Sequence, residues 1–171
     1  MIKAIVYRTN TGSAEEYAKL FANKTGLPAY SADEAKKNLT SGTEIIFFGW
    51  VMAGGIKGYK AAANRFSVRA VCAVGMAKTG GQASELQNKN RIPDNVPLFT
   101  LQGNFDVNRL HGVYRIMMGI MLKTLGKALK QKTDRTEEEN DMLDMMVCGD
   151  KRVNSENLKA VLEWHAAYER K

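Results

Sequence analysis

The segment Thr9-Asn10-Thr11-Gly12-Ser13 combines residue types that can bind an anion. It follows a short, β-branched apolar run and precedes a helical pattern, so its backbone N–H groups are expected at a helix N-terminus. Such groups have no partners within the helix and carry a partial positive charge, and small residues with hydroxyls let them surround a phosphate. The GxxxxGK spacing of nucleotide hydrolases and the dinucleotide fingerprint GxGxxG are both absent here.

An ordinary polar turn is the alternative interpretation of this loop. Ser13 and Glu16 have the spacing of a capping box, in which two side chains satisfy a helix N-terminus without a ligand. The loop alone does not decide between the two interpretations. Its position after the first of five predicted strands favours the phosphate site.

The sequence IVYRTNTGSAEEYA resembles the first strand, phosphate loop and first helix of the flavodoxin family, whose loop is Ser/Thr-x-Thr-Gly-x-Thr/Ser. Thr9, Thr11 and Gly12 match this motif, whereas Ala14 replaces the final hydroxyl residue. The fold-level resemblance extends over about residues 2–102 and the last helix. It implies flavin mononucleotide (FMN) as the cofactor, with its phosphate bound by Thr9, Asn10, Thr11, Gly12, Ser13 and Ala14.

A glycine-rich loop, residues 51–58, follows the third apolar strand. Trp50 ends that strand, and Gly54 and Gly55 would allow a flat ligand to approach the backbone closely. In flavodoxins the equivalent loop surrounds the isoalloxazine ring, which implies cofactor contacts from Trp50, Val51, Met52, Ala53 and Gly54. The resemblance also implies a peptide here that responds to flavin reduction. The alternatives are a core position for Trp50 and an ordinary turn for the glycines.

The loop after the fourth strand supplies the remaining expected cofactor contacts, which are Ala77, Lys78, Thr79 and Gly80. Flavodoxins commonly have a tyrosine here against the outer face of the flavin. This sequence has no aromatic residue between Met76 and Gln82. The resemblance therefore implies a flavin whose outer face is open or is covered by another side chain. A solvated surface charge is the alternative interpretation of Lys78.

Five apolar segments alternate with helical patterns and position these loops. The segments are residues 2–7, 28–31, 43–50, 68–76 and 97–102. The alternation is typical of an α/β three-layer sandwich with a doubly wound, five-stranded parallel sheet, here of flavodoxin type. Ligands in such folds bind at the carboxyl ends of the strands. We expect residues 1–171 to form a single flavodoxin-like domain with a helical insertion at about 106–150.

A long amphipathic helix is predicted for residues 110–132, and its charges are all basic: Arg115, Lys123, Lys127, Lys130 and Lys132. The acidic segment 136–147 follows, with Thr136 and Glu139 at capping-box spacing, so a helical hairpin is predicted. The segment RLHGVYRIMMGIMLKTLGK loosely resembles a basic extension of the flavodoxin-type protoporphyrinogen oxidases, which pass electrons to quinones. Basic amphipathic helices suit anionic membrane surfaces. Packing on the sheet or in a homodimer is the alternative.

Length and composition limit the class of protein. A chain of 171 residues with a net charge of +7 predicts one domain that attracts anionic partners. Two cysteines form no disulfide framework, and no apolar run approaches the roughly 20 residues of a membrane-spanning helix. No signal peptide is evident, so we expect a cytoplasmic protein, with peripheral membrane attachment as an open alternative.

Several other residues are interpreted as structural. Cys72 lies in an apolar strand and is expected to be an inert core thiol. His165 is expected to be a hydrogen-bonded core residue, and neither it nor His111 has metal-ligand spacing. Few aromatic residues alternate with the basic ones, so no nucleic-acid binding is predicted.

Three functions are compatible with this pattern. The first is an FMN-binding redox protein that transfers electrons to a partner protein or a small-molecule acceptor, with no catalytic protein side chain because the flavin carries the chemistry. The second is a protoporphyrinogen oxidase with a quinone acceptor. The third is a non-catalytic binding protein that has lost the flavin, which Ala14 and the missing aromatic residue would explain. FMN binding separates the third from the others, and turnover with protoporphyrinogen and a quinone separates the first two.

Overall fold

The computed structural model describes residues 1–104, 113–137, 139–140, 143 and 151–170. The chain divides into two compact units, Met1–Gly103 with Val153–Lys171, and Asn104–Arg152. The first unit contains the sheet and the loops of the expected cofactor site. The second contains a long helix.

The first unit is built on a parallel sheet. Its strands are β1 (Ala4–Arg8), β2 (Ala29–Ser31), β3 (Glu44–Met52), β5 (Ser67–Gly75) and β6 (Leu98–Gln102), in the order β2-β1-β3-β5-β6. All neighbours along this order are parallel. A further strand, β4 (Gly55–Ile56), pairs antiparallel with β3. The predicted five-stranded parallel sheet is therefore confirmed, and β4 extends it.

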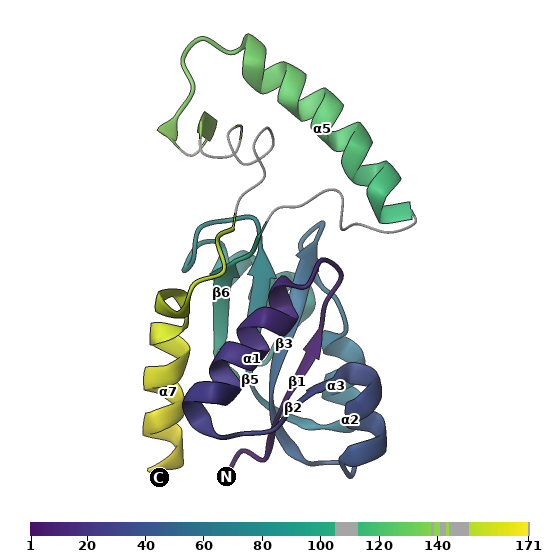
Figure 1. Ribbon diagram of the computed structural model, residues 1–171, viewed down its shortest axis with the longest axis vertical. Helices are drawn as coiled ribbons and strands as arrows, with labels where there is room; N and C mark the ends of the chain where they lie inside the picture. The colour runs from purple at the N-terminus through teal and green to yellow at the C-terminus, as the bar shows by residue number, and fades with distance from the viewer. Residues whose placement is uncertain (105–112, 138, 141–142, 144–150, 171) are drawn as a thin grey trace. The chain divides into compact units, whose positions relative to one another are not determined.

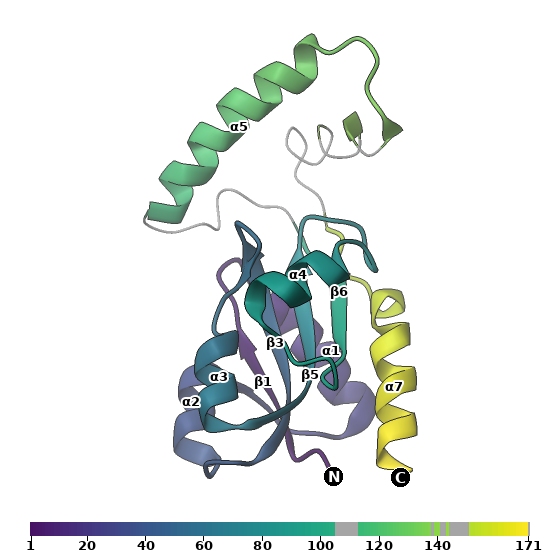
Figure 2. The same cartoon turned by 180° about the vertical axis from the view of Figure 1, so that it is seen from behind.

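Helices cover both faces of the sheet. On one face lie α1 (Ser13–Thr25) and α7 (Lys159–Glu169), which follows a 3₁₀ turn, η2 (Ser155–Leu158) (Figure 1). On the other face lie α2 (Ala32–Asn38), α3 (Tyr59–Arg65) and α4 (Ala83–Asn90) (Figure 2). This arrangement confirms the three-layer α/β sandwich predicted from the alternation of patterns.

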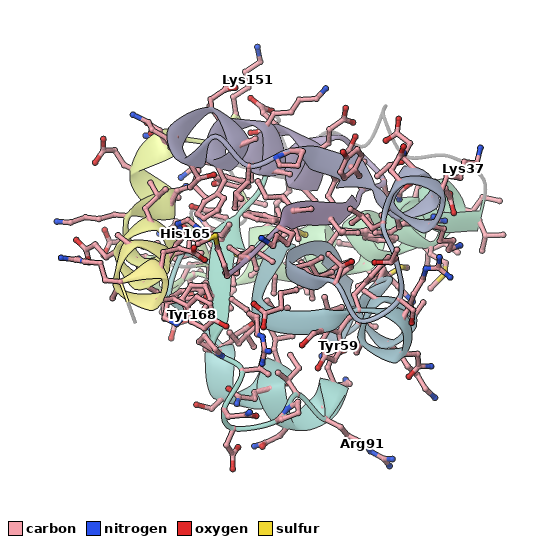
Figure 3. All side chains as sticks on the ribbon, turned by 90° about the horizontal axis from the view of Figure 1, so that it is seen from below. Lys37, Tyr59, Arg91, Lys151, His165 and Tyr168 are labelled. Carbon is pink, nitrogen blue, oxygen red and sulfur yellow. The ribbon has the colours of Figure 1, made fainter. Side chains whose placement is uncertain are left out.

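The two faces bury separate hydrophobic clusters, because successive residues of a strand point to opposite sides. Phe48 packs with Phe21 of α1 in the first cluster, and Phe47 packs with Tyr59 of α3 in the second. Tyr59 is directed into the interior, whereas Lys37 and Arg91 extend outward (Figure 3). The continuous apolar run of β3 thus serves both layers, as expected for a central parallel strand.

The predicted loop at residues 51–58 is wrong in part. Val51 and Met52 belong to β3, and Met52 pairs with Gly55 across a two-residue turn. Ala53 and Gly54 form this turn with positive φ angles of 48° and 71°. Two successive positive φ angles define a type I′ turn, whose twist matches that of the strands it joins. A tight β-hairpin therefore occupies most of the segment expected to be a loop.

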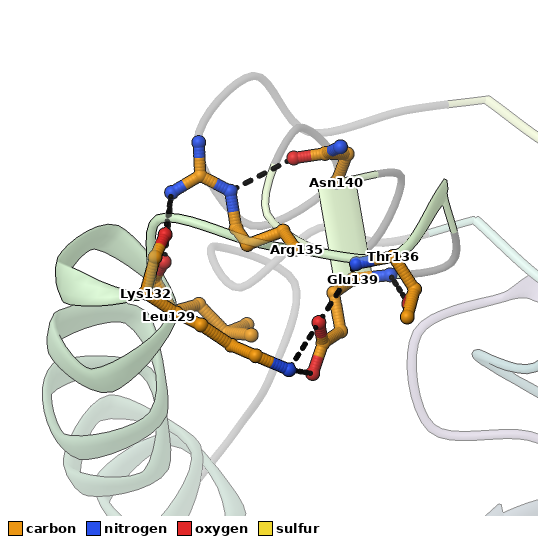
Figure 4. Close-up of polar contacts among 6 residues, drawn as sticks. All are labelled: Leu129, Lys132, Arg135, Thr136, Glu139 and Asn140. Carbon is orange, nitrogen blue, oxygen red and sulfur yellow. Dashed lines mark hydrogen bonds and ion pairs between the residues drawn. The ribbon is translucent and has the colours of Figure 1, made fainter.

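The second unit contains α5 (Val113–Gln131). Arg135 caps the C-terminus of this helix, because its guanidinium donates to the carbonyl oxygens of Leu129 and Lys132 at 2.9 and 3.0 Å (Figure 4). Thr136 and Glu139 form the predicted capping box, with distances of 2.9 and 3.2 Å between each backbone nitrogen and the other side chain's oxygen. Residues 138, 141–142 and 144–147 of the predicted acidic helix lie outside the described residues.

Candidate cofactor-binding site

The carboxyl ends of four strands lie at one edge of the parallel sheet. Arg8 at the end of β1 pairs with Gly49, and Trp50 on β3 pairs with Val74. Gly75 at the end of β5 pairs with Gln102 at the end of β6. The loop after β1, the β3–β4 hairpin and the loop after β5 therefore emerge at the same edge, where folds of this class bind ligands.

The loop after β1 leads directly into α1. Gly12 is the N-cap residue, with a positive φ of 99°, and as a glycine it has no side chain with which to cap the helix. Ser13 is the first helical residue, so the alternative capping box with Ser13 as N-cap is not formed. An α-helix that begins without a side-chain cap offers backbone N–H groups to an external acceptor.

Side chains of this loop add hydrogen-bonding capacity. Thr9 Oγ1 accepts from the Gly12 backbone nitrogen at 3.0 Å, which leaves the Thr9 hydroxyl hydrogen available for donation. The Asn10 amide nitrogen is buried and has no hydrogen-bond partner among the described residues. A buried donor without a partner is costly, so an acceptor at this position beside the helix N-terminus would be favourable. Thr11 is half-buried in the same loop.

Ala14, the residue that departs from the flavodoxin motif, has a buried side chain. The Ala14 side chain is 1% exposed and belongs to the first hydrophobic cluster with Tyr17 and Phe21. Ser13 beside it is 5% exposed. Residue 14 therefore contributes to the packing of α1 on the sheet, and the hydroxyl groups of this loop come from its neighbours.

The first turn of α1 is anchored to the end of β6. The Tyr17 hydroxyl donates to the Gln102 carbonyl at 2.6 Å and accepts from the Asn157 amide at 2.7 Å. Burial raises the pKa of the Tyr17 hydroxyl, which keeps it protonated as a donor. A Cβ atom on Gly103 would lie only 3.2 Å from Ser13 Cβ, so the chain after β6 lies directly against the loop.

The β3–β4 hairpin is attached to α4 by one side chain that the sequence did not single out. The Asn90 amide donates to the Gly54 carbonyl at 2.9 Å and accepts from the Ile56 backbone nitrogen at 2.7 Å. It also donates to the Leu86 carbonyl of its own helix at 2.8 Å. These contacts determine where the hairpin lies. They join residues 34 and 36 positions apart, so no local pattern could have predicted them.

The predicted contacts of the hairpin differ in exposure. Trp50 is half-buried, belongs to neither hydrophobic cluster, and its carbonyl accepts from the Lys57 nitrogen at 2.9 Å. Val51 packs against the second cluster and lies next to Gly75, where an added Cβ would be 3.3 Å from Val51 Cβ. Met52 is half-buried, and Ala53 is exposed at the tip. The hairpin thus brings Trp50, Met52 and its turn to the carboxyl edge of the sheet.

The loop after β5 turns toward β6. The Gly80 nitrogen donates to the Thr100 carbonyl at 3.1 Å, and the Gln102 nitrogen donates to Thr79 Oγ1 at 3.1 Å. Thr79 and Gly80 are therefore held along β6, while Ala77 is half-buried nearer the end of β5 and Lys78 is exposed.

The described side chains at this edge offer hydroxyl and amide groups for binding. The Cys72 thiol on β5 is fully buried, and burial raises its pKa well above the usual value, which confirms the expected core thiol. The site instead combines an uncapped helix N-terminus with a glycine-containing hairpin. Such a combination suits a ligand that has an anionic group and a flat ring system.

A scan against models of known protein families finds no match to this sequence, and a search of curated proteins finds no significant match. The fold and the site define the chain as an α/β three-layer sandwich with a candidate ligand site at the carboxyl edge of its parallel sheet.

Proposed function

We propose that this chain binds FMN and acts as a flavodoxin-like redox protein that transfers electrons to a partner protein or a small-molecule acceptor. The observation that carries the proposal is the buried amide nitrogen of Asn10, which has no partner among the described residues. It lies in the loop that leads to the uncapped start of α1. A phosphate oxygen would satisfy the amide and would be stabilised by the helix N-terminus.

Different loops at the sheet edge would bind the phosphate and the ring system of FMN. The loop of Thr9, Asn10, Thr11 and Gly12, with the first turn of α1, would hold the phosphate. The hairpin that carries Trp50 and the loop that carries Ala77 would lie beside the ring system. When bound, FMN supplies one- and two-electron transfer, and the chain orients it and limits access of water.

Titration of the purified chain with FMN tests the proposal. Saturable one-to-one binding should quench flavin fluorescence and shift the visible absorption bands. The Asn10→Asp variant should bind FMN at least about 100-fold more weakly, because its carboxylate would repel the phosphate dianion. Asn64→Asp is the matched control, since Asn64 is exposed on α3 and the change in charge is the same.

Two results would contradict the proposal. Failure of the wild-type chain to bind FMN would favour a binding protein that has lost the flavin. Equal weakening by Asn10→Asp and Asn64→Asp would place the phosphate away from the loop. The electron acceptor is a separate question, which assays of the FMN-loaded chain with protoporphyrinogen and a quinone, or with a one-electron acceptor protein, would address.

A further inference from the structure

Helix α5 has a continuous exposed apolar face. Val113, Ile116, Met117 and Ile120 are 68, 67, 49 and 60% exposed. Their spacing of three, four and seven residues places them on one side of the helix. Exposed large side chains gathered in this way are uncommon on a monomeric protein surface and indicate a binding face.

The opposite side of α5 is the packed one. Leu129 is only 8% exposed, and at about 100° per residue it lies across the helix from Val113 and Ile120. The helix therefore has a buried position on the side away from the exposed apolar face. The exposed apolar face is a second surface that this packing does not use.

The charge on α5 has a single sign. The sequence between Val113 and Gln131 contains no acidic residue, and Lys123, Lys127 and Lys130 are all exposed. Lys127 continues the line of the exposed apolar side chains, and Lys123 lies beside that line. Lys132, just beyond the helix, forms an ion pair with Glu139 at 2.8 Å (Figure 4).

We propose that this face of α5 binds the surface of an anionic lipid bilayer. The four apolar side chains would enter the interfacial region, and the lysines would reach the lipid phosphates through their flexible stems. A second copy of the chain is a poorer occupant, because α5 offers no acidic residue to pair with the lysines of a second α5. No described helix is long and apolar enough to cross a bilayer.

Co-sedimentation of the full chain with vesicles tests this proposal independently of FMN. Vesicles of phosphatidylcholine with phosphatidylglycerol should bind the chain, and vesicles of phosphatidylcholine alone should bind it at least tenfold more weakly. Raising the salt concentration from 0.05 to about 0.5 M should reduce binding to the anionic vesicles, because surface charges are screened over a shorter distance.

Two double variants separate the apolar and electrostatic contributions. Lys123→Gln with Lys127→Gln should weaken binding by about 25-fold, at about fivefold per lysine. Ile116→Ser with Ile120→Ser should weaken it by at least tenfold, with unchanged thermal unfolding because both side chains are already exposed. The matched control is Lys24→Gln with Lys60→Gln, which removes two exposed lysines from the first unit and should have little effect.

Four outcomes would overturn the proposal. One is failure to bind anionic vesicles, and another is equal binding to neutral and anionic vesicles. The third is a concentration-dependent dimer that Ile116→Ser with Ile120→Ser abolishes, which would assign the face to a second copy of the chain. Equal loss in the two lysine variants would also contradict a specific role of α5.

Discussion

The amide nitrogen of Asn10 would be unpaired without a ligand and paired when a phosphate is bound. This nitrogen is buried without a described partner, and a phosphate oxygen would supply an acceptor for it. The local cost of an unpaired buried donor is typical of binding sites.

The Asn10→Ala variant should therefore change affinity and stability in opposite directions. Loss of a hydrogen bond to a charged group should weaken FMN binding by about 10- to 100-fold. The free energy of unfolding without FMN should stay unchanged or rise by up to about 1 kcal/mol, because an unpaired buried donor is removed. Fluorescence titration and urea unfolding measure the two quantities. A destabilised variant with unchanged affinity would mean that Asn10 is structural.

His165 on α7 provides a second residue-scale prediction. Its ring meets the edge of Phe21 at a centroid distance of 5.5 Å, and its Nε2 is buried with no hydrogen-bond partner among the described residues. The expected hydrogen bond at this nitrogen is thus not found. Burial lowers the pKa of His165 below its usual value, although nearby Glu169 opposes the shift.

This shift predicts a pH-dependent stability. The unfolded chain takes up a proton as the pH falls through about 6.5, whereas the folded chain does so only at lower pH. Stability should therefore decrease as the pH is lowered from 7.5 to 5.5, and this contribution should vanish above about pH 7.5. In His165→Leu the loss over this interval should be smaller, as urea unfolding at several pH values would measure. A difference between the two proteins that does not vary with pH would contradict the assignment.

At the scale of elements, the β3–β4 hairpin depends on Asn90 of α4. Replacing Asn90 with Ala removes its hydrogen bonds to Gly54 and Ile56 and should lower the free energy of unfolding by about 2–3 kcal/mol. FMN affinity should also fall, by about tenfold, because the hairpin would have to be ordered on binding. Titration and urea unfolding of the variant would measure both effects.

Asn88→Ala is the matched control, because Asn88 is exposed on the same helix and its side chain has no contact with the hairpin among those found. Asn90→Asp keeps the acceptor for the Ile56 nitrogen and loses the donor to Gly54. It should therefore fall between the wild-type protein and Asn90→Ala in stability. FMN affinity that is the same in all three would show that the hairpin does not contact the cofactor.

The sequence predicted the elements better than their contacts. The apolar runs around Ile5, Phe47 and Cys72 predicted the buried strands, because burial on both faces leaves a continuous local signal. The hairpin turn was missed because Ala53 stands where asparagine or aspartate would usually mark a type I′ turn. The role of Asn90 was missed because it depends on contacts across the fold. The unpaired state of Asn10 is likewise visible only once its surroundings are known.

At the scale of the whole molecule, the net charge of +7 bears on the proposed redox chemistry. Electron-shuttling flavodoxins are acidic, and negative charge near a flavin disfavours its fully reduced anion. A basic chain should stabilise that anion and make the second one-electron reduction potential less negative. The charge near this edge of the sheet should matter most, and Lys78 is an exposed base in the loop after β5.

Lys78→Glu should lower that potential by tens of millivolts in the FMN-loaded chain, because a nearby positive charge is replaced by a negative one. Lys24→Glu makes the same change in charge in the last turn of α1, far along the helix from the proposed phosphate site, and should have a smaller effect. A redox titration of both variants measures the difference. Equal shifts would mean that only the total charge matters.

The most direct test of the central claim compares FMN with riboflavin, which lacks the phosphate. If the loop of Thr9–Gly12 and the start of α1 hold the phosphate, the dissociation constant of riboflavin should exceed that of FMN by at least about 100-fold, or roughly 3 kcal/mol. The ratio should fall markedly in Asn10→Ala. Equal affinity for the two flavins in the wild-type chain would contradict the account, because the phosphate would then contribute nothing to binding.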